Sequence, residues 1–173
     1  FRQTTVHNAL TLNNQNLETT ESVTKLWKPE GDVQILVTEN PSYKNLKHRR
    51  SIFFVNEQYF VIVDEAIGDA TGTINLHYQL CDGDVNINAK AFSLSSEFAG
   101  DSQVKLQCFA TKKTTMKKEE GWYSVGYRQR TERTAVSFNT EKKGKDNVQF
   151  VTVIYPAKSN KEFPKIEAKI KNN

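Results

Sequence analysis

The chain has 173 residues, of which 37% are hydrophobic and 25% are charged. These values are typical of one globular domain and exclude a disordered chain and a two-domain enzyme with a large helical body. The 24 Lys and Arg residues outnumber the 20 Asp and Glu residues, and the net charge of +4 favours anionic partners. No apolar run approaches the roughly 18 residues needed to span a bilayer. The chain starts at Phe1 and its single methionine is Met116, so we expect a piece of a longer protein.

Short runs of β-branched and aromatic residues, separated by turn residues, follow one another along the chain, and helical periodicity is nearly absent. The clearest hairpin spans residues 51–65, where Asn56-Glu57-Gln58 connects two apolar runs. Its uninterrupted apolar residues indicate that both faces are covered, by a second sheet or a neighbouring domain. The pattern predicts an all-β fold, an antiparallel β-sandwich forming one domain over residues 1–173. We expect strands at residues 4–12, 33–38, 47–55, 59–65, 72–80, 91–98, 103–110, 135–139 and 148–155.

The end of the chain and the two cysteines carry weaker signals. Residues 156–173 read as a polar final connection with one alternating stretch at 165–171.

Cys81 and Cys108 permit one disulfide or none, and neither belongs to a CxxC motif or a His/Cys cluster. Both lie in strand-like runs, so we interpret each as a buried free thiol.

All three histidines lie in predicted strands, and two of them stand apart from the basic clusters. If His7 is part of a strand, its side chain shares a face with Thr5 and Ala9. Taken alone it is interpreted as a structural histidine, because a metal site needs several ligands and the chain shows no spaced set of them. His77 alternates with Asn75 and Gln79, which predicts a surface position or hydrogen bonds between strands.

The densest positive cluster contains Lys44, Lys47, His48, Arg49 and Arg50. Arginine forks and lysine charges of this kind suit sulfate and carboxylate groups. Strand alternation limits the cluster, because it places Lys47 and Arg49 on one face and His48 and Arg50 on the other.

A second basic zone mixes positive and aromatic side chains between residues 112 and 133. Such a mixture can bind nucleic acid, but the chain has no nucleic-acid-binding signature, so we favour a glycan whose sugar rings stack on the aromatic side chains. The residues in question are Lys112, Lys113, Lys117, Lys118, Trp122, Tyr123, Tyr127, Arg128, Arg130 and Arg133.

Several blocks of the sequence resemble the heparinase II/III family. They cover residues 2–12, 16–27, 38–50, 59–65 and 151–156, so the resemblance spans nearly the whole chain and is loosest at about residues 82–103. The first block contains the signature of an arginine, four residues, and then His7-Asn8. The resemblance implies an enzyme with a helical toroid followed by an antiparallel β-sandwich, of which this chain is the sandwich without its first strands.

The resemblance also implies a reaction, the β-elimination of a uronic-acid-containing glycan such as heparan sulfate or a related acidic polysaccharide. This chemistry needs a general base, an acid for the leaving oxygen and a donor for the developing enolate. In the family a Tyr, a His and an Asn upstream of this segment fill these roles, so no catalytic residue is assigned here. The alternative function is a non-catalytic glycan-binding or purely structural sandwich.

Site residues follow in part from the same resemblance. It implies that His7 is a ligand of a divalent metal, zinc or calcium, with the other ligands outside this chain. It further implies a toroid domain as partner and a periplasmic or secreted bacterial location. No nucleic-acid partner and no membrane span are expected. The resemblance and the basic clusters together give a set of substrate-binding candidates: Lys44, His48, Arg49, Arg50, Arg128 and Arg130.

Overall fold

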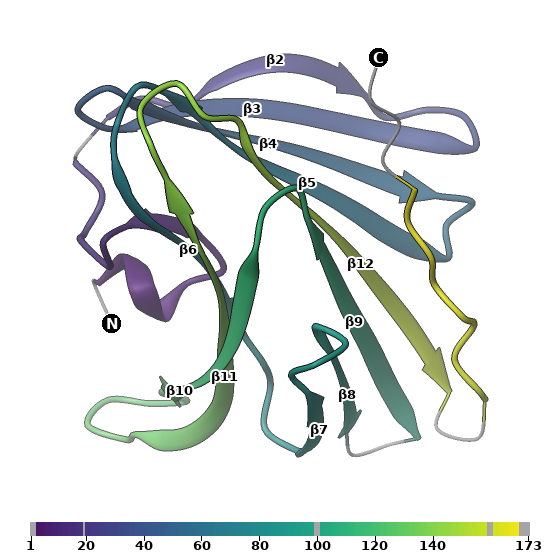
Figure 1. Cartoon of the computed structure of the whole chain (residues 1–173). Helices are drawn as coiled ribbons and strands as arrows, with labels where there is room; N and C mark the ends of the chain where they lie inside the picture. Colours follow the sequence, from purple (N-terminus) through teal and green to yellow (C-terminus); the bar gives the residue numbers. More distant parts are fainter. Residues whose placement is uncertain (1–2, 19, 99–100, 159–160, 170–173) are drawn as a thin grey trace.

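The computed structural model describes residues 3–18, 20–98, 101–158 and 161–169, and antiparallel strands dominate it (Figure 1). A single 3-10 turn, η1, spans Thr4–Val6. The strands are β1 Leu10–Leu12, β2 Val23–Lys28, β3 Val33–Tyr43, β4 Leu46–Val55, β5 Tyr59–Gly68, β6 Gly72–Gln79, β7 Asp84–Asn88, β8 Ser93–Phe98, β9 Ser102–Ala110, β10 Thr114–Tyr123, β11 Thr131–Lys142 and β12 Val148–Lys158.

The strands form two sheets that pack face to face, which confirms the predicted β-sandwich (Figure 1). The small sheet has the order β1-β6-β11-β10, and the large sheet has the order β2-β3-β4-β5-β12-β9-β8-β7. Leu76 and Phe138 from the small sheet belong to the same hydrophobic core as Leu106 and Phe150 from the large sheet, and all four are at most 1% exposed. Burial of this apolar surface is the main force that holds the two sheets together.

The predicted hairpin at 51–65 is formed by β4 and β5, which pair from Leu46 with Gly68 to Val55 with Tyr59. Asn56 and Glu57 both have positive φ, and the Gln58 amide donates to the Val55 carbonyl at 2.9 Å. Left-handed residues of this kind give the tight turn a twist that matches the strands. The register also fixes which face each β4 side chain occupies.

Several of the predicted element boundaries need correction. Residues 4–12 are not one strand, because only Leu10–Leu12 pairs with β6 while Thr4–Val6 forms η1. Three strands were not predicted: β2, β7 and β10. Residues 165–169 form no strand, and residues 170–171 lie outside the described residues.

The cysteine prediction is half right. Both thiols are free, but only Cys108 is buried, and Cys81 is exposed just after β6. Burial raises the pKa of the Cys108 thiol to about 12, so it stays protonated as a small apolar core group. The described part of the chain contains no helix with the length and apolarity that a membrane crossing requires.

Candidate functional site

The positive cluster at 44–50 is divided by strand alternation, as predicted. Lys47 Nζ donates to Glu39 Oε2 at 2.9 Å, and Arg49 Nε donates to Glu39 Oε1 at 2.8 Å. Arg49 also reaches Glu65 at 3.6 Å. Hydrogen bonds from Lys47 and Arg49 lower the pKa of Glu39 to about 2. On this outer face of the large sheet, two of the predicted cations are therefore partly neutralised by carboxylates of the same sheet.

The other half of the cluster points into the sandwich. His48 Nε2 lies 2.6 Å from Asp64 Oδ1, and Arg50 Nε donates to the same oxygen at 2.7 Å. Burial opposes ionisation of Asp64, but the hydrogen bond from His48 and the charge of Arg50 outweigh it and lower its pKa. Because Asp64 is 0% exposed, this contact holds His48 and Arg50 away from the outer surface.

The remaining predicted substrate residues lie in two exposed turns. Lys44 is in the turn between β3 and β4. Arg128 and Arg130 are in the connection between β10 and β11, where each guanidinium lies over an aromatic ring. The distance from Arg128 to the Tyr127 ring centre is 5.2 Å, and that from Arg130 to the Trp122 ring centre is 3.5 Å. The six candidates therefore do not form one cluster: His48 and Arg50 share Asp64 inside the sandwich, while the other four lie on the outer face of the large sheet or in exposed turns.

His7 lies in an irregular segment, residues 4–9, which we call the His7 segment. Its side chain is exposed just beyond η1, and it is not on a strand, which corrects the predicted sharing of a face with Thr5 and Ala9. The His7 amide donates to the Thr4 carbonyl at 3.1 Å, and the Ala9 amide donates to the His7 carbonyl at 2.9 Å. The imidazole is therefore exposed to solvent, while the backbone on either side of it is held by local hydrogen bonds.

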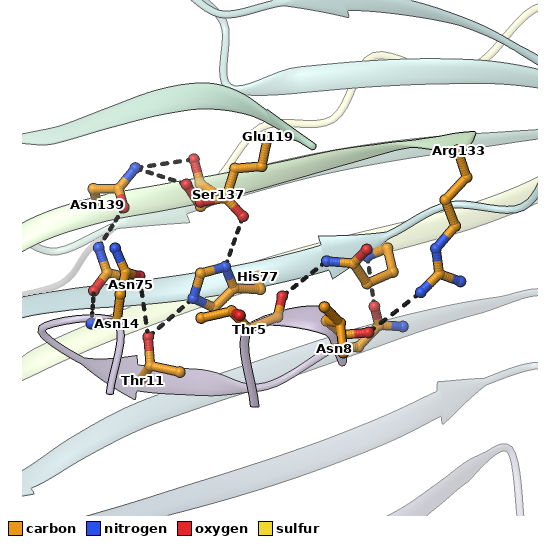
Figure 2. A network of polar contacts seen from close by, with 12 residues as sticks. Thr5, Asn8, Thr11, Asn14, Asn75, His77, Glu119, Arg133, Ser137 and Asn139 are labelled. Atoms are coloured by element: carbon orange, nitrogen blue, oxygen red, sulfur yellow. Dashed lines mark hydrogen bonds and ion pairs between the residues drawn. The ribbon is translucent and has the colours of Figure 1, made fainter. Parts of the chain in front are cut away.

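Next to the His7 segment, the outer face of the small sheet carries a network of polar side chains (Figure 2). His77 Nε2 lies 2.9 Å from Thr11 Oγ1, and its Nδ1 lies 2.8 Å from Glu119 Oε2. Burial raises the pKa of Glu119, but hydrogen bonds from His77 and Ser137 outweigh it, so the net pKa is lowered. The predicted bonds between strands are confirmed for His77, whereas a surface position is wrong, because it is 1% exposed.

A polar pocket of about 400 Å³ opens beside this network. Its walls come from three strands of the small sheet and from the turn after β1. Amides, hydroxyls, one ammonium and one carboxylate provide both hydrogen-bond donors and acceptors. The lining residues are Asn13, Asn14, Thr73, Asn75, Lys117, Glu119, Ser137 and Asn139.

The surroundings of His7 bear on the divalent metal that the family resemblance implies. Within the described residues, no group of three or more His, Cys, Asp or Glu side chains is placed to hold a metal ion. Structural zinc usually has four ligands and calcium six or more. The described residues alone therefore do not complete such a site around His7.

Sequence reasoning missed the groups that fix these side chains in place. Asp64 was visible as a charged residue inside a run of Val and Ile, which is a signal of a paired buried carboxylate. Glu39 sits in a less apolar run, and only the strand register shows that it faces Arg49. Gln79, which bonds to the His7 segment, has no sequence signal that we recognise.

Comparison with known proteins relates the whole chain to one family. The family described as heparinase II/III-like, C-terminal, matches residues 1–164. A heparin-sulfate lyase from Bacteroides stercoris is 57% identical over 171 residues, which are 99% of this chain and 26% of that protein. A heparin-sulfate lyase from Pedobacter heparinus is 34% identical over 157 residues, 90% of this chain and 24% of that protein. The chain thus spans about a quarter of the length of these relatives.

Solved structures give the same relation. A heparinase III structure superposes with a TM-score of 0.94 at 56% identity, over 99% of this chain and 27% of the other. A heparan sulfate lyase from Pedobacter heparinus superposes with a TM-score of 0.88 at 33% identity, over 93% of this chain and 25% of the other.

Proposed function

The chain belongs to the heparinase II/III-like family and corresponds to its C-terminal domain, and from this we propose that its parent protein is a polysaccharide lyase. The proposed substrate is heparan sulfate or a related acidic polysaccharide, which is cleaved by β-elimination. The observation that carries the proposal is the 57% identity to a heparin-sulfate lyase over 99% of this chain. The sandwich described above is then the C-terminal part of a larger enzyme with a helical toroid.

In this proposal the acid-base chemistry lies outside this chain. Elimination requires a base that removes the C5 proton of the uronate and an acid that protonates the leaving oxygen. We assign both to upstream residues. The role of the sandwich is to support the toroid and to form one wall of the substrate cleft.

The exposed connection between β10 and β11 is the part of this chain best suited to contact a sulfated sugar. The guanidinium groups of Arg128 and Arg130 lie over the rings of Tyr127 and Trp122. Aromatic rings can cover the apolar face of a sugar, while arginine pairs with sulfate or carboxylate. Lys44 and Arg49 are weaker candidates of the same kind.

We further propose that His7 is one ligand of a divalent metal, zinc or calcium, at the border of this domain. Exposure of the imidazole supports this role. Metal analysis of the purified parent protein tests it. We expect about one metal ion per molecule and a loss of most of it in the His7→Ala variant, and unchanged metal content would contradict the assignment.

A periplasmic or secreted location is part of the same proposal, because the substrate is extracellular glycan. Fractionation of the source cells with an antibody against the parent protein checks it. The expected signal is in the periplasm or the medium.

Activity is tested with the parent protein and heparan sulfate. Each elimination leaves an unsaturated uronate, whose absorbance reports the reaction directly. We expect this absorbance to rise with time. A parent protein that folds and produces no such product would remove the lyase proposal, whereas inactivity of this chain alone would not.

A non-catalytic glycan-binding role is the second candidate, and the exposed arginine–aromatic pairs favour it. This chain is applied to immobilised heparin and eluted with salt. The double change Arg128→Ala and Arg130→Ala is expected to lower the salt needed for elution. The double change Lys143→Ala and Lys145→Ala removes the same charge elsewhere on the surface and serves as control. Equal elution of both variants would count against glycan contact at this connection.

A further inference from the structure

The His7 segment is irregular in conformation, yet all of its backbone carbonyls accept hydrogen bonds. The carbonyls of Thr4, His7 and Ala9 accept from backbone amides. The donor to Ala9 is the amide of His77, at 2.9 Å. Buried or half-buried carbonyls need such partners, and irregular segments usually obtain them from water. Here the remaining three partners are side chains.

Three side chains from two sheets serve the other carbonyls. Gln79 Nε2, at the end of β6, donates to the Thr5 carbonyl at 3.0 Å. Arg133 Nη2, on β11, donates to the Val6 carbonyl at 3.2 Å. Figure 2 shows Arg133 reaching from its strand towards the segment beside Asn8. The two carbonyls lie immediately before that of His7, so these bonds hold the backbone that leads into His7 in one conformation.

The third donor comes from the opposite sheet. Arg50 Nη1, on β4, donates to the Asn8 carbonyl at 2.7 Å, while its Nε is held by Asp64 at 2.7 Å. The Asn8 side chain adds a further bond to β6, because its Oδ1 accepts from the backbone N–H of Gln79 at 2.6 Å. The carbonyls on both sides of His7 are therefore bound by arginines from different layers of the sandwich.

We propose that Gln79, Arg133 and Arg50 form a clamp that positions the His7 imidazole. A planar guanidinium suits this role, because it is permanently charged and its donors have fixed directions. Holding a backbone in one conformation before a ligand arrives removes the entropy cost of ordering it later. In this view Arg50 is a positioning residue that acts through His7, not a group that contacts the glycan.

The clamp is an inference about the segment itself, and its importance for activity rests on the proposed function of His7. The two are separated by two measurements on the full-length parent protein. Hydrogen–deuterium exchange of residues 4–9 reports the clamp. Lyase turnover reports what His7 does.

The first variants are Arg133→Ala and Gln79→Leu, which each remove one donor. Because hydrogen bonds from charged donors are among the stronger ones, loss of the Arg133 bond is expected to speed exchange in residues 4–9 about tenfold or more. Arg133→Lys keeps a charged donor and is expected to restore part of the protection. Exchange in the remaining strands should not change.

Arg50 needs a gentler change, because removing its charge would leave Asp64 buried without its cation. Arg50→Lys keeps the charge, but one ammonium cannot reproduce the fork that serves Asp64 and Asn8 together. We expect faster exchange in the segment. In the exchange measurement, Arg49→Lys, on the neighbouring residue of the opposite face, is the matched control, and Lys143→Ala is the control for Arg133.

A comparison of kcat between single and double variants separates positioning of His7 from a general loss of stability. If Arg133 acts through His7, then Arg133→Ala and His7→Ala each lower kcat, and the double variant is no slower than His7→Ala alone. Independent, multiplicative losses would overturn the clamp as a positioning device. Exchange in residues 4–9 that equals the controls, or that rises evenly over the whole sandwich, would overturn it as well. If exchange is raised but His7→Ala keeps full activity, the clamp stands and the role proposed for His7 fails.

Discussion

At the level of single residues, two carboxylates decide what the positive cluster at 44–50 can do. Glu39 binds Lys47 and Arg49 on the outer face of the large sheet, and Asp64 binds His48 and Arg50 inside the sandwich. Sequence alternation correctly separated the two halves, but it could not supply the partners. Those come from β3 and β5, the strands just before and just after β4, and only the strand register decides which carboxylate faces which cation.

The lowered pKa of Glu39 predicts an acid-sensitive contribution to stability. Its pKa is about 2 in the folded chain, against an ordinary value of 4.5. The carboxylate therefore stabilises the fold fully above pH 4.5, and this contribution is lost as the pH falls from 4.5 towards 2. Because Lys47 and Arg49 are more than a third exposed, we expect about 1–2 kcal/mol rather than the full value of the shift.

Urea unfolding of this chain and of Glu39→Gln, at several pH values from 7 to 2, measures this contribution. The variant should be less stable at pH 7, and the gap should close as the pH approaches 2. The exposed Glu21→Gln is the control and should show a small effect at every pH. A gap for Glu39→Gln that stays constant down to pH 2 would contradict the assignment.

At the level of elements, edge strands are where the sequence prediction failed. The unpredicted strands β2, β7 and β10 are all at sheet edges, and the overextended one, β1, is the fourth edge. β2 is exposed at all six positions and β10 is rich in Lys and Glu. Charges on edges prevent pairing with other chains, and they also remove the apolar alternation by which strands are recognised in a sequence.

The turn between β4 and β5 gives a prediction at the same level. Glu57 has a φ of +55°, a conformation that costs an ordinary L-residue about 1 kcal/mol or more. Glu57→Gly removes this strain and is expected to raise the free energy of unfolding by about 0.5–1 kcal/mol. Gln58→Gly, at a neighbouring position without positive φ, is expected to lower it. Thermal unfolding of both variants decides the matter, and equal effects would show that the backbone conformation plays no part.

At the level of the whole molecule, one lysine joins the two sheets. Lys142, at the end of β11 in the small sheet, is 0% exposed. Its ammonium donates to the carbonyls of Gly68, Gly144 and Asp146 at 2.9, 2.7 and 2.6 Å. Burial lowers the pKa of this lysine, and the three carbonyls use all of its donors. Gly68 ends β5, so the contact ties the large sheet to the small one.

Replacing Lys142 by methionine keeps most of the volume and removes the three bonds. Three carbonyls then lose their charged donor, and we expect the free energy of unfolding to fall by about 2–4 kcal/mol. Lys143→Met, on the exposed neighbour, should change it by less than about 0.5 kcal/mol. Chemical unfolding of the two variants provides the comparison. Equal stability of Lys142→Met and the unchanged chain would show that this contact does not join the sheets.

The sequence by itself determined the all-β class, the central strands, the β4–β5 hairpin and the family, because buried strands carry dense apolar runs and blocks such as the one with His7-Asn8 resemble the family. It did not determine the edge strands, the partners of the basic cluster or the bonds that hold the His7 segment. Only the tertiary structure decided these. Their donors and acceptors, such as Arg50 with Asn8 and Arg133 with Val6, are 42 and 127 residues apart. No local pattern records a contact that arises when two sheets close on each other.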